Sequence, residues 1–159
     1  AWTTPAAGGG ASVQLFALKS SAQSLAISAN FAEPDIVSFD ATPITAPTLG
    51  TWNGTRFTVG ATGAGVYDVR VQILTDAPVA AAPEVSVNGS VSGGGNLYGT
   101  SASYANSTRS PRRYRGSVSG LLYLNAGDFF EVRAVNATTA IALPILVDGS
   151  TRIPVVKLN

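Results

Sequence analysis

The sequence predicts an all-β protein, an antiparallel sandwich or jelly roll, on three observations. Residues 65–74 alternate between two sets of side chains with a period of two, which is typical of a strand with one buried face. Short apolar runs recur along the chain and are separated by Gly, Pro and Asn turns. No segment has a convincing helical pattern. Roughly eight to ten short strands of this kind indicate a sandwich or a jelly roll.

The first part of the chain has the least regular pattern. Between residues 13 and 27, apolar residues at helical spacing are interrupted by serines. We expect a strand, a turn and another strand here, with a short helix as the alternative. Residues 36–39 form a short apolar run just after Pro34, and residues 56–59 form another that ends at Gly60. Both runs are predicted strands because turn residues bound them.

Strands with clearer limits follow in the second half of the chain. Residues 84–87 are a predicted strand because they end in an Asn-Gly pair, a strong hairpin signal. Alternating apolar residues predict a strand over 117–124, which turns at residues 125–127. The next predicted strand spans 129–135, and a last one, 151–158, closes the fold.

The length of 159 residues fits one compact domain. Residues 1–12 are predicted to be a flexible arm, because Pro5 and three consecutive glycines cannot bury an apolar face. Residues 13–159 then form a single jelly-roll domain. The long loops 41–51 and 89–116 are expected to serve function or assembly, as loops of this length usually do.

The composition excludes several classes of function. Hydrophobic residues make up 45% of the chain, whereas charged residues make up only 12%, about half the usual share. A surface so poor in charge suits a virion protein, an extracellular module or a subunit covered by its neighbours. The net charge of +1 gives no field that would attract nucleic acid or an acidic membrane, so neither is an expected partner.

The chain has no histidine and no cysteine, so the usual catalytic triads and zinc sites cannot form. A glycosidase-type pair among the nine scattered carboxylates is a weak alternative, because no motif supports it. Glu33 and Asp35 lie close in sequence and are either calcium ligands or, as we prefer, solvated turn residues. We therefore expect no enzymatic activity, no cofactor and no metal.

The sharpest local feature is a basic segment in the longer loop. Four of the ten basic residues fall close together in it: Arg109, Arg112, Arg113 and Arg115. Guanidinium groups form bidentate hydrogen bonds with carboxylates and phosphates, so we predict that this segment contacts other proteins of an assembly. The alternatives are a solvated loop or, with Tyr104 and Tyr114 stacking on bases, binding of nucleic acid or other anions.

Two further elements are candidates for binding a partner. Trp2 and Pro5 lie on the Gly-rich arm, and one buried Trp can anchor an interface; the alternative is a disordered tail. The rim of the longer loop would serve instead if the chain binds a receptor or a carbohydrate. Its expected contact residues are Tyr98, Tyr104 and Asn106.

Three segments together resemble a known family. Residues 52–59 read Trp-Asn-Gly-Thr-Arg-Phe-Thr-Val and lead to the Gly-Val-Tyr-Asp-Val strand that starts at Gly65. Residues 122–132 read Leu-Tyr-Leu-Asn-Ala-Gly-Asp-Phe-Phe-Glu-Val, and residues 153–158 form a last strand. In this order and spacing, the segments resemble the C1q/TNF-like domains over about residues 35–158.

The resemblance implies a ten-stranded jelly roll that forms a tight homotrimer. The physical pattern agrees with it, because four large residues are spaced to point inward: Phe57, Tyr67, Leu124 and Phe129. Gly65 and Gly127 stand where the backbone must turn. The chain has no collagen-like Gly-X-Y stalk, so a collagen-linked role in complement is not expected.

The opening Ala-Trp-Thr-Thr-Pro, with Ala17, Leu18 and Lys19 further on, also looks like the start of many phage tail and head-associated proteins. We therefore predict a structural virion protein, either a trimeric capsid decoration or a fibre- or tail-associated protein, made in the host cytoplasm. Its expected partners are copies of itself and other virion proteins, such as the major capsid or tail proteins. The alternative is a receptor- or carbohydrate-binding head on a virion or a cell surface.

Overall fold

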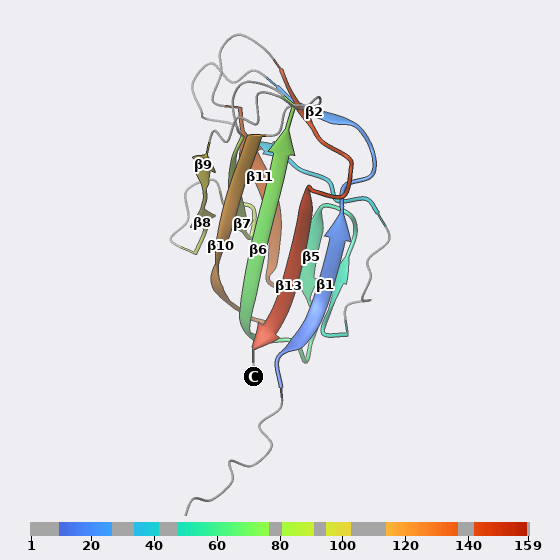
Figure 1. Cartoon of the computed structure of the whole chain (residues 1–159). Coiled ribbons are helices and arrows are strands. Elements are labelled where there is room, and N and C mark those ends of the chain that lie inside the picture. The colour runs from blue at the N-terminus through green and yellow to red at the C-terminus, as the bar shows by residue number, and fades with distance from the viewer. Residues whose placement is uncertain are drawn as a thin grey trace, which may run out of the picture.

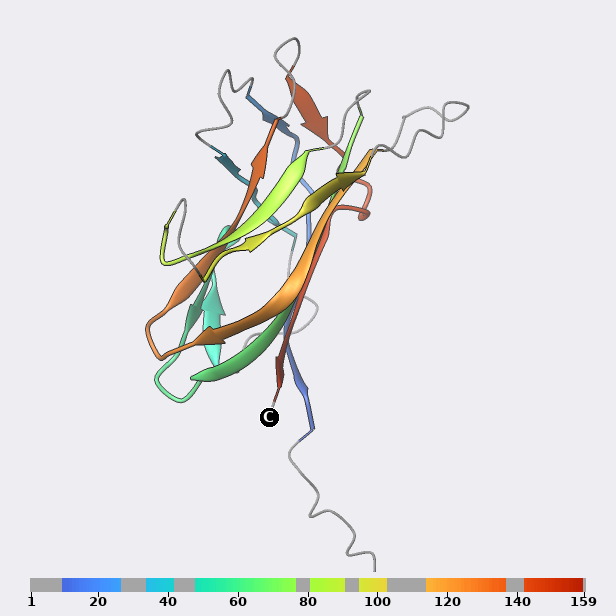
Figure 2. The same cartoon turned by 90° about the vertical axis from the view of Figure 1, so that its left-hand side faces the viewer.

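A computed structural model describes residues 10–26, 34–41, 48–76, 81–90, 95–102, 114–136 and 142–158. Throughout these ranges the regular secondary structure is β-strand, in two antiparallel sheets that form two layers (Figure 1, Figure 2). The described ranges contain no helix that could cross a membrane. The predicted all-β sandwich is confirmed.

Sheet A is the layer that faces the viewer in Figure 1. Its seven strands are β1 (Ser12–Leu18), β2 (Gln23–Leu25), β6 (Gly65–Thr75), β9 (Thr100–Ala102), β10 (Tyr114–Leu124), β12 (Leu143–Ile145) and β13 (Arg152–Leu158). The main order is β1-β13-β6-β10-β9, and β12 pairs with both β2 and β6. The four long strands β1, β13, β6 and β10 therefore lie side by side.

Sheet B forms the second layer. Its six strands are β3 (Asp35–Ile36), β4 (Gly50–Trp52), β5 (Arg56–Val59), β7 (Ala82–Val87), β8 (Leu97–Tyr98) and β11 (Phe129–Val135). The order is β4-β5-β11-β7-β8, with β3 beside β11. The chain passes from one sheet to the other after β2, β5, β6, β8, β10 and β11, which is the winding of a jelly roll.

Most predicted strands are confirmed, and two of them, 56–59 and 129–135, have the predicted limits. The first segment forms a strand, a turn and a strand, not the helical alternative. The predicted loop 89–116 holds the short strands β8 and β9, which pair with β7 and β10. The described part therefore has thirteen strands, more than expected. Pieces of two or three residues are defined by their pairing with a neighbour and leave no periodic pattern in the sequence.

An aromatic cluster joins the two sheets at the centre of the core. The Phe57 and Phe130 rings of sheet B stack with centroids 5.4 Å apart, and Tyr67 of sheet A meets Phe57 edge-on at 5.7 Å. All three side chains are completely buried. The Tyr67 hydroxyl donates a 2.5 Å hydrogen bond to the Gly63 carbonyl, so its polar atom is satisfied inside the core.

The prediction that Phe129 points inward is wrong, because its neighbour Phe130 occupies the core position. Phe130 lies opposite Phe57 in the β5–β11 ladder and shares its inward face. Successive side chains of a strand point to opposite faces, so Phe129 faces outward. There the Arg56 guanidinium lies 3.9 Å from the centroid of the Phe129 ring. Two adjacent Phe residues fit either phase, so the sequence pattern alone could not separate them.

A row of charged side chains is largely buried on the outer face of sheet B. Glu131 accepts hydrogen bonds from Arg56 Nη2 at 2.6 Å and from Arg133 Nη2 at 3.3 Å. Arg133 Nη2 also donates to the Gly89 carbonyl. Glu84 lies opposite Arg133, but its buried Oε1 atom has no hydrogen-bond partner. Burial therefore raises the pKa of Glu84, and the nearby charge of Arg133 offsets only part of this effect.

The aromatic cluster can be tested with two adjacent substitutions. Phe130→Ala should lower the free energy of unfolding by about 3–5 kcal/mol, because it opens a cavity between the sheets. Phe129→Ala, the matched control, should cost about 1 kcal/mol, since Phe129 is half-buried outside the core and the substitution removes mainly its contact with Arg56. Urea unfolding of both variants gives the two values. Equal costs would mean that the assigned phase of β11 is incorrect.

Glu84 should make the protein less stable as the pH rises. Its pKa is raised in the folded state, so the folded chain binds this proton more tightly than the unfolded chain above pH 4.5. The stability loss should grow from there until the pH passes the folded pKa. Glu84→Gln should remove this loss and flatten the stability profile above about pH 4.5.

Thermal unfolding across this pH range measures the effect of Glu84→Gln. Glu131→Gln is the control, because it replaces a buried carboxylate that is already paired with two arginines. This control should destabilise the protein at pH 7, as expected when a buried ion pair is broken. If Glu84→Gln destabilises the protein as much as Glu131→Gln does, Glu84 is a satisfied partner and our interpretation is wrong.

Candidate assembly and binding surface

The outer face of sheet A is set by the alternation of its strands. In β6, four side chains point into the core: Tyr67, Val69, Val71 and Ile73. The side chains between them point outward, as the period of two predicted. In β10 the inward residues include Val118 and Leu122, and the outward residues Ser117, Ser119, Leu121 and Tyr123 are exposed. Every second residue of these strands therefore contributes to one outer surface.

One half of this surface is an apolar stripe that crosses four strands. We define the stripe by six residues: Val13, Val66, Leu121, Tyr123, Val156 and Leu158. Tyr123 lies opposite Val66, which in turn lies opposite Leu158. In the next row, Leu121 and Val156 flank Asp68, and Val13 lies beyond Val156. Directly opposed residues have Cβ atoms about 5 Å apart, so these side chains form nearly continuous rows.

Three members of the stripe are open to solvent although they are large and apolar, and the other three are half-buried: Val66, Val156 and Leu158. Tyr123 is 70% exposed, Leu121 60% and Val13 48%. Elsewhere in the described chain the exposed large apolar residues come from separate elements: Ile36, Tyr98 and Val147. Contiguous apolar surface, unlike single exposed residues, marks a contact site. The stripe lies at the lower end of sheet A in Figure 1, where β13 ends and β1 begins.

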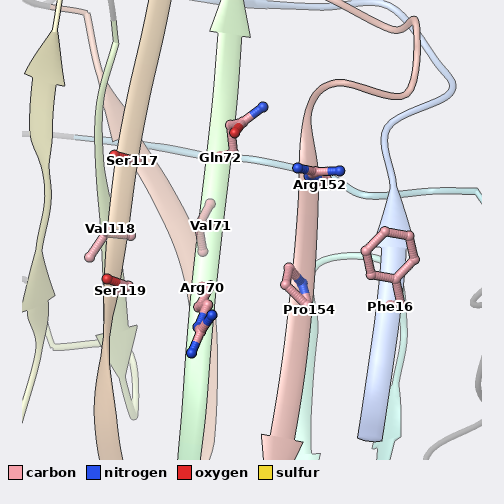
Figure 3. A pocket seen from close by; sticks show the side chains of 9 residues that line it. All are labelled: Phe16, Arg70, Val71, Gln72, Ser117, Val118, Ser119, Arg152 and Pro154. Carbon is pink, nitrogen blue, oxygen red and sulfur yellow. The ribbon is translucent and has the colours of Figure 1, made fainter.

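The other half of the surface is polar and basic. Arg70 Nη2 pairs with the Asp68 carboxylate at 2.8 Å, and this contact raises the pKa of Arg70. Arg152 is exposed and forms no hydrogen bond or ion pair within the described chain. A pocket of about 330 Å³ lies between β10, β6, β13 and β1 on this face (Figure 3). Arg70 and Arg152 line it together with serine hydroxyls, and Phe16 and Pro154 form its apolar side.

Only two of the sequence-predicted site residues lie in the described part of the chain. Tyr98 is 61% exposed on β8 of sheet B, and Arg115 is exposed on β10 of sheet A. Their side chains lie on the outer faces of different sheets, so the structure does not bring them together. The other predicted residues lie outside the described ranges: Trp2, Pro5, Tyr104, Asn106, Arg109, Arg112 and Arg113.

The structure bears on two alternatives for the basic loop and the acidic residues. Tyr114 is only 6% exposed, so the suggestion that it stacks on a nucleic-acid base is wrong. Asp35 accepts a 2.6 Å hydrogen bond from the Ala26 amide, while Glu33 lies outside the described ranges. The described residues include no group of three or more His, Cys, Asp or Glu side chains that could hold a metal ion.

The apolar stripe was not predicted from the sequence, although a signal was present. Residues 121–124 are four consecutive apolar residues within β10. A strand with one solvated face should alternate, whereas an unbroken apolar run is typical of a strand covered on both faces. The run therefore predicts that the outer side of β10 is covered as well, whereas Leu121 and Tyr123 are exposed in the described chain.

Comparison with known proteins bears on the fold. No protein-family model matches the chain, and no curated protein sequence matches it. Among solved structures, murine APRIL at pH 5.0 matches with a TM-score of 0.61 and 18% identity, covering 93% of this chain and 99% of that one. Murine APRIL at pH 8.5 gives a TM-score of 0.60 with the same identity and coverage.

Rabbit GITRL matches more weakly, with a TM-score of 0.43, 14% identity and coverage of 71% of this chain and 79% of that one. The likeness to murine APRIL extends over nearly all of both chains. At 18% identity it establishes the fold alone. The chain thus has a jelly roll of the C1q/TNF-like kind.

Proposed function

We propose that this chain is a non-enzymatic assembly and binding module that forms a homotrimer through the outer face of sheet A. The observation that carries the proposal is the apolar stripe, which crosses β10, β6, β13 and β1 and is left open by its own chain. Covering it would remove exposed apolar area from water, at roughly 25 cal/mol for each Å². A copy of the same chain is the simplest cover, since most soluble oligomers are closed and symmetric.

Two further observations support a trimer. The sequence resembles the C1q/TNF-like domains, a resemblance that implies a tight homotrimer, and the fold agrees with this resemblance. The charged fraction of 12% is low for a chain that meets solvent on all sides. A trimer would cover the face of each protomer that is richest in exposed apolar residues.

The finer proposal is a structural role in a virion, as a capsid decoration or as a fibre- or tail-associated protein. It is supported by the low charge, the absence of cysteine and the likeness of the opening residues to phage structural proteins. Tyr98 favours the second candidate function, a receptor- or carbohydrate-binding head. It is exposed on sheet B, so it would stay accessible after the apolar stripe of sheet A is covered.

The assembly proposal predicts that polar substitutions in the stripe dissociate the oligomer. Light scattering of the parent protein should give about three times the chain mass of 16.2 kDa. The double variant Leu121→Ser/Tyr123→Ser should be a folded monomer, because both side chains point away from the core. A monomeric parent protein would overturn the proposal.

A matched control keeps this experiment specific to the stripe. The double variant Ile36→Ser/Val147→Ser removes two apolar side chains of 43% and 44% exposure that lie outside the stripe. It should remain trimeric by light scattering. Circular dichroism of both variants shows whether the sheets are intact. If the two variants dissociate alike, the loss reflects general destabilisation and not a specific interface.

The two finer roles predict different effects of a single substitution. For a binding head, Tyr98→Ala should weaken attachment to receptor-bearing cells or to immobilised glycans, because it removes an exposed aromatic contact. For a decoration protein, the same variant should bind the purified particle like the parent protein. There, removal of residues 1–9 or replacement of Arg109, Arg112, Arg113 and Arg115 by Ser should lower occupancy in cryo-EM. Loss in neither assay would contradict both roles.

A further inference from the structure

The polar half of the outer face of sheet A gathers hydrogen-bond donors from three neighbouring strands. Arg152 of β13 lies opposite Gln72 of β6, and Arg70 is two residues along from Gln72. Such diagonal neighbours are roughly 7–8 Å apart, close enough for two guanidinium groups to reach one ligand. On the other side, Ser117 and Ser119 of β10 lie opposite Gln72 and Arg70. All five residues line the same pocket of about 330 Å³ (Figure 3).

Most of these donors are uncommitted. The guanidinium group of Arg152 has no hydrogen bond or ion pair within the described chain, and neither do the hydroxyls of Ser117 and Ser119. Arg70 uses Nε and Nη2 on the Asp68 carboxylate, which leaves its Nη1 group unused. Gln72 donates Nε2 to the Ser150 carbonyl and is held in place by this bond. A guanidinium has five N–H donors and no acceptor, so these free groups together select a ligand that accepts hydrogen bonds and carries negative charge.

The described carboxylates of a second copy are less available for this role, because they are hydrogen-bonded, paired or buried within their own chain. Eight of the nine carboxylates are described, and each of them is already engaged or buried. Asp35, Asp40 and Asp128 accept hydrogen bonds from their own chain, and Asp68 and Glu131 are in ion pairs. Asp76 and Asp148 also have partners. The last of the eight, Glu84, is buried on sheet B.

We infer that this pocket binds an oxyanion group, phosphate or sulfate, held by the guanidinium groups of Arg152 and Arg70 and by the hydroxyls of Ser117 and Ser119. Charge-assisted hydrogen bonds of arginine to such groups are frequently bidentate and about twice as strong as neutral ones. Phe16 and Pro154 give the pocket an apolar side, so an oxyanion attached to an apolar group fits it better than the free ion. The inference goes beyond the proposed assembly, because every group of the site belongs to one protomer.

Calorimetric titration of the purified protein with inorganic phosphate tests the site, with sodium chloride matching the ionic strength throughout. The parent protein should bind one phosphate per protomer in a saturable manner. Arg152→Gln should weaken binding on the order of tenfold or more, since it removes the guanidinium that has no other partner. Arg152→Lys should fall in between, because it keeps the charge but loses the bidentate geometry.

Arg115→Gln is the matched control. Arg115 is exposed on the same face and carries the same charge, but it does not line the pocket. Its replacement should leave phosphate affinity within about twofold of the parent protein, because contacts between solvent-exposed charges are weak and screened by salt. Equal weakening in Arg115→Gln and Arg152→Gln, or a signal that follows ionic strength without saturation, would overturn the inference.

A second titration separates the free ion from an oxyanion carried on another molecule. Phenyl phosphate should bind more tightly than inorganic phosphate if the apolar side of the pocket contributes, and Phe16→Ser should abolish only that difference. Equal affinity of the two ligands would assign the site to the free ion. Light scattering on the same samples reports the oligomeric state separately. A monomer that binds phosphate would contradict the proposed trimer but support this site. A trimer that binds no phosphate would support the assembly but contradict the site.

Discussion

The contact between the two sheets at Phe57, Tyr67 and Phe130 is the constraint on which the other features depend. These rings fill the centre of the core and fix which side chains of β5, β6 and β11 point inward. Because side chains alternate along a strand, burying Tyr67 places Val66 and Asp68 on the opposite face. The outer surface of sheet A is therefore a consequence of how the interior packs.

The two outer faces of the sandwich differ in how many of their charged and apolar side chains have partners within the described chain. On sheet B, Glu131 forms one ion pair with Arg56 and another with Arg133. On sheet A, the apolar stripe has no cover, and Arg152 has no ionic partner in the described chain. Exposed unsatisfied groups are what a partner or a ligand can use, and this asymmetry is the reason why we propose sheet A as the face for assembly and ligand binding. The stripe and the pocket are adjacent there but require different chemistry.

Much of the fold was accessible from local pattern. The period of two in β6 identified the strand and its inward face, and turn residues gave the limits of β5. The alternation of apolar residues gave no answer at Phe129 and Phe130, because either residue could be the inward one. It also gave none for β8 and β9, because these strands are too short to show a period. The candidate site was predicted less well. The prediction from the sequence relied on single conspicuous residues, such as Trp2 and the four clustered arginines. The surface that we propose consists of valines, leucines, serines and arginines from four strands, which attract attention only when they lie side by side.

The sequence by itself determined the class of the protein: a β-sandwich without histidine or cysteine, poor in charge, and with a period of two that identifies the inward face of its most regular strands. Only the tertiary structure decided which outward residues become neighbours. The apolar rows and the pair formed by Arg70 and Arg152 arise from the register between β10, β6, β13 and β1. Alternation along a strand is a local property of the backbone, so it can be recognised in the sequence. Register is set by pairing between segments far apart in the chain and by packing of the whole core, and it emerges only when the chain has folded.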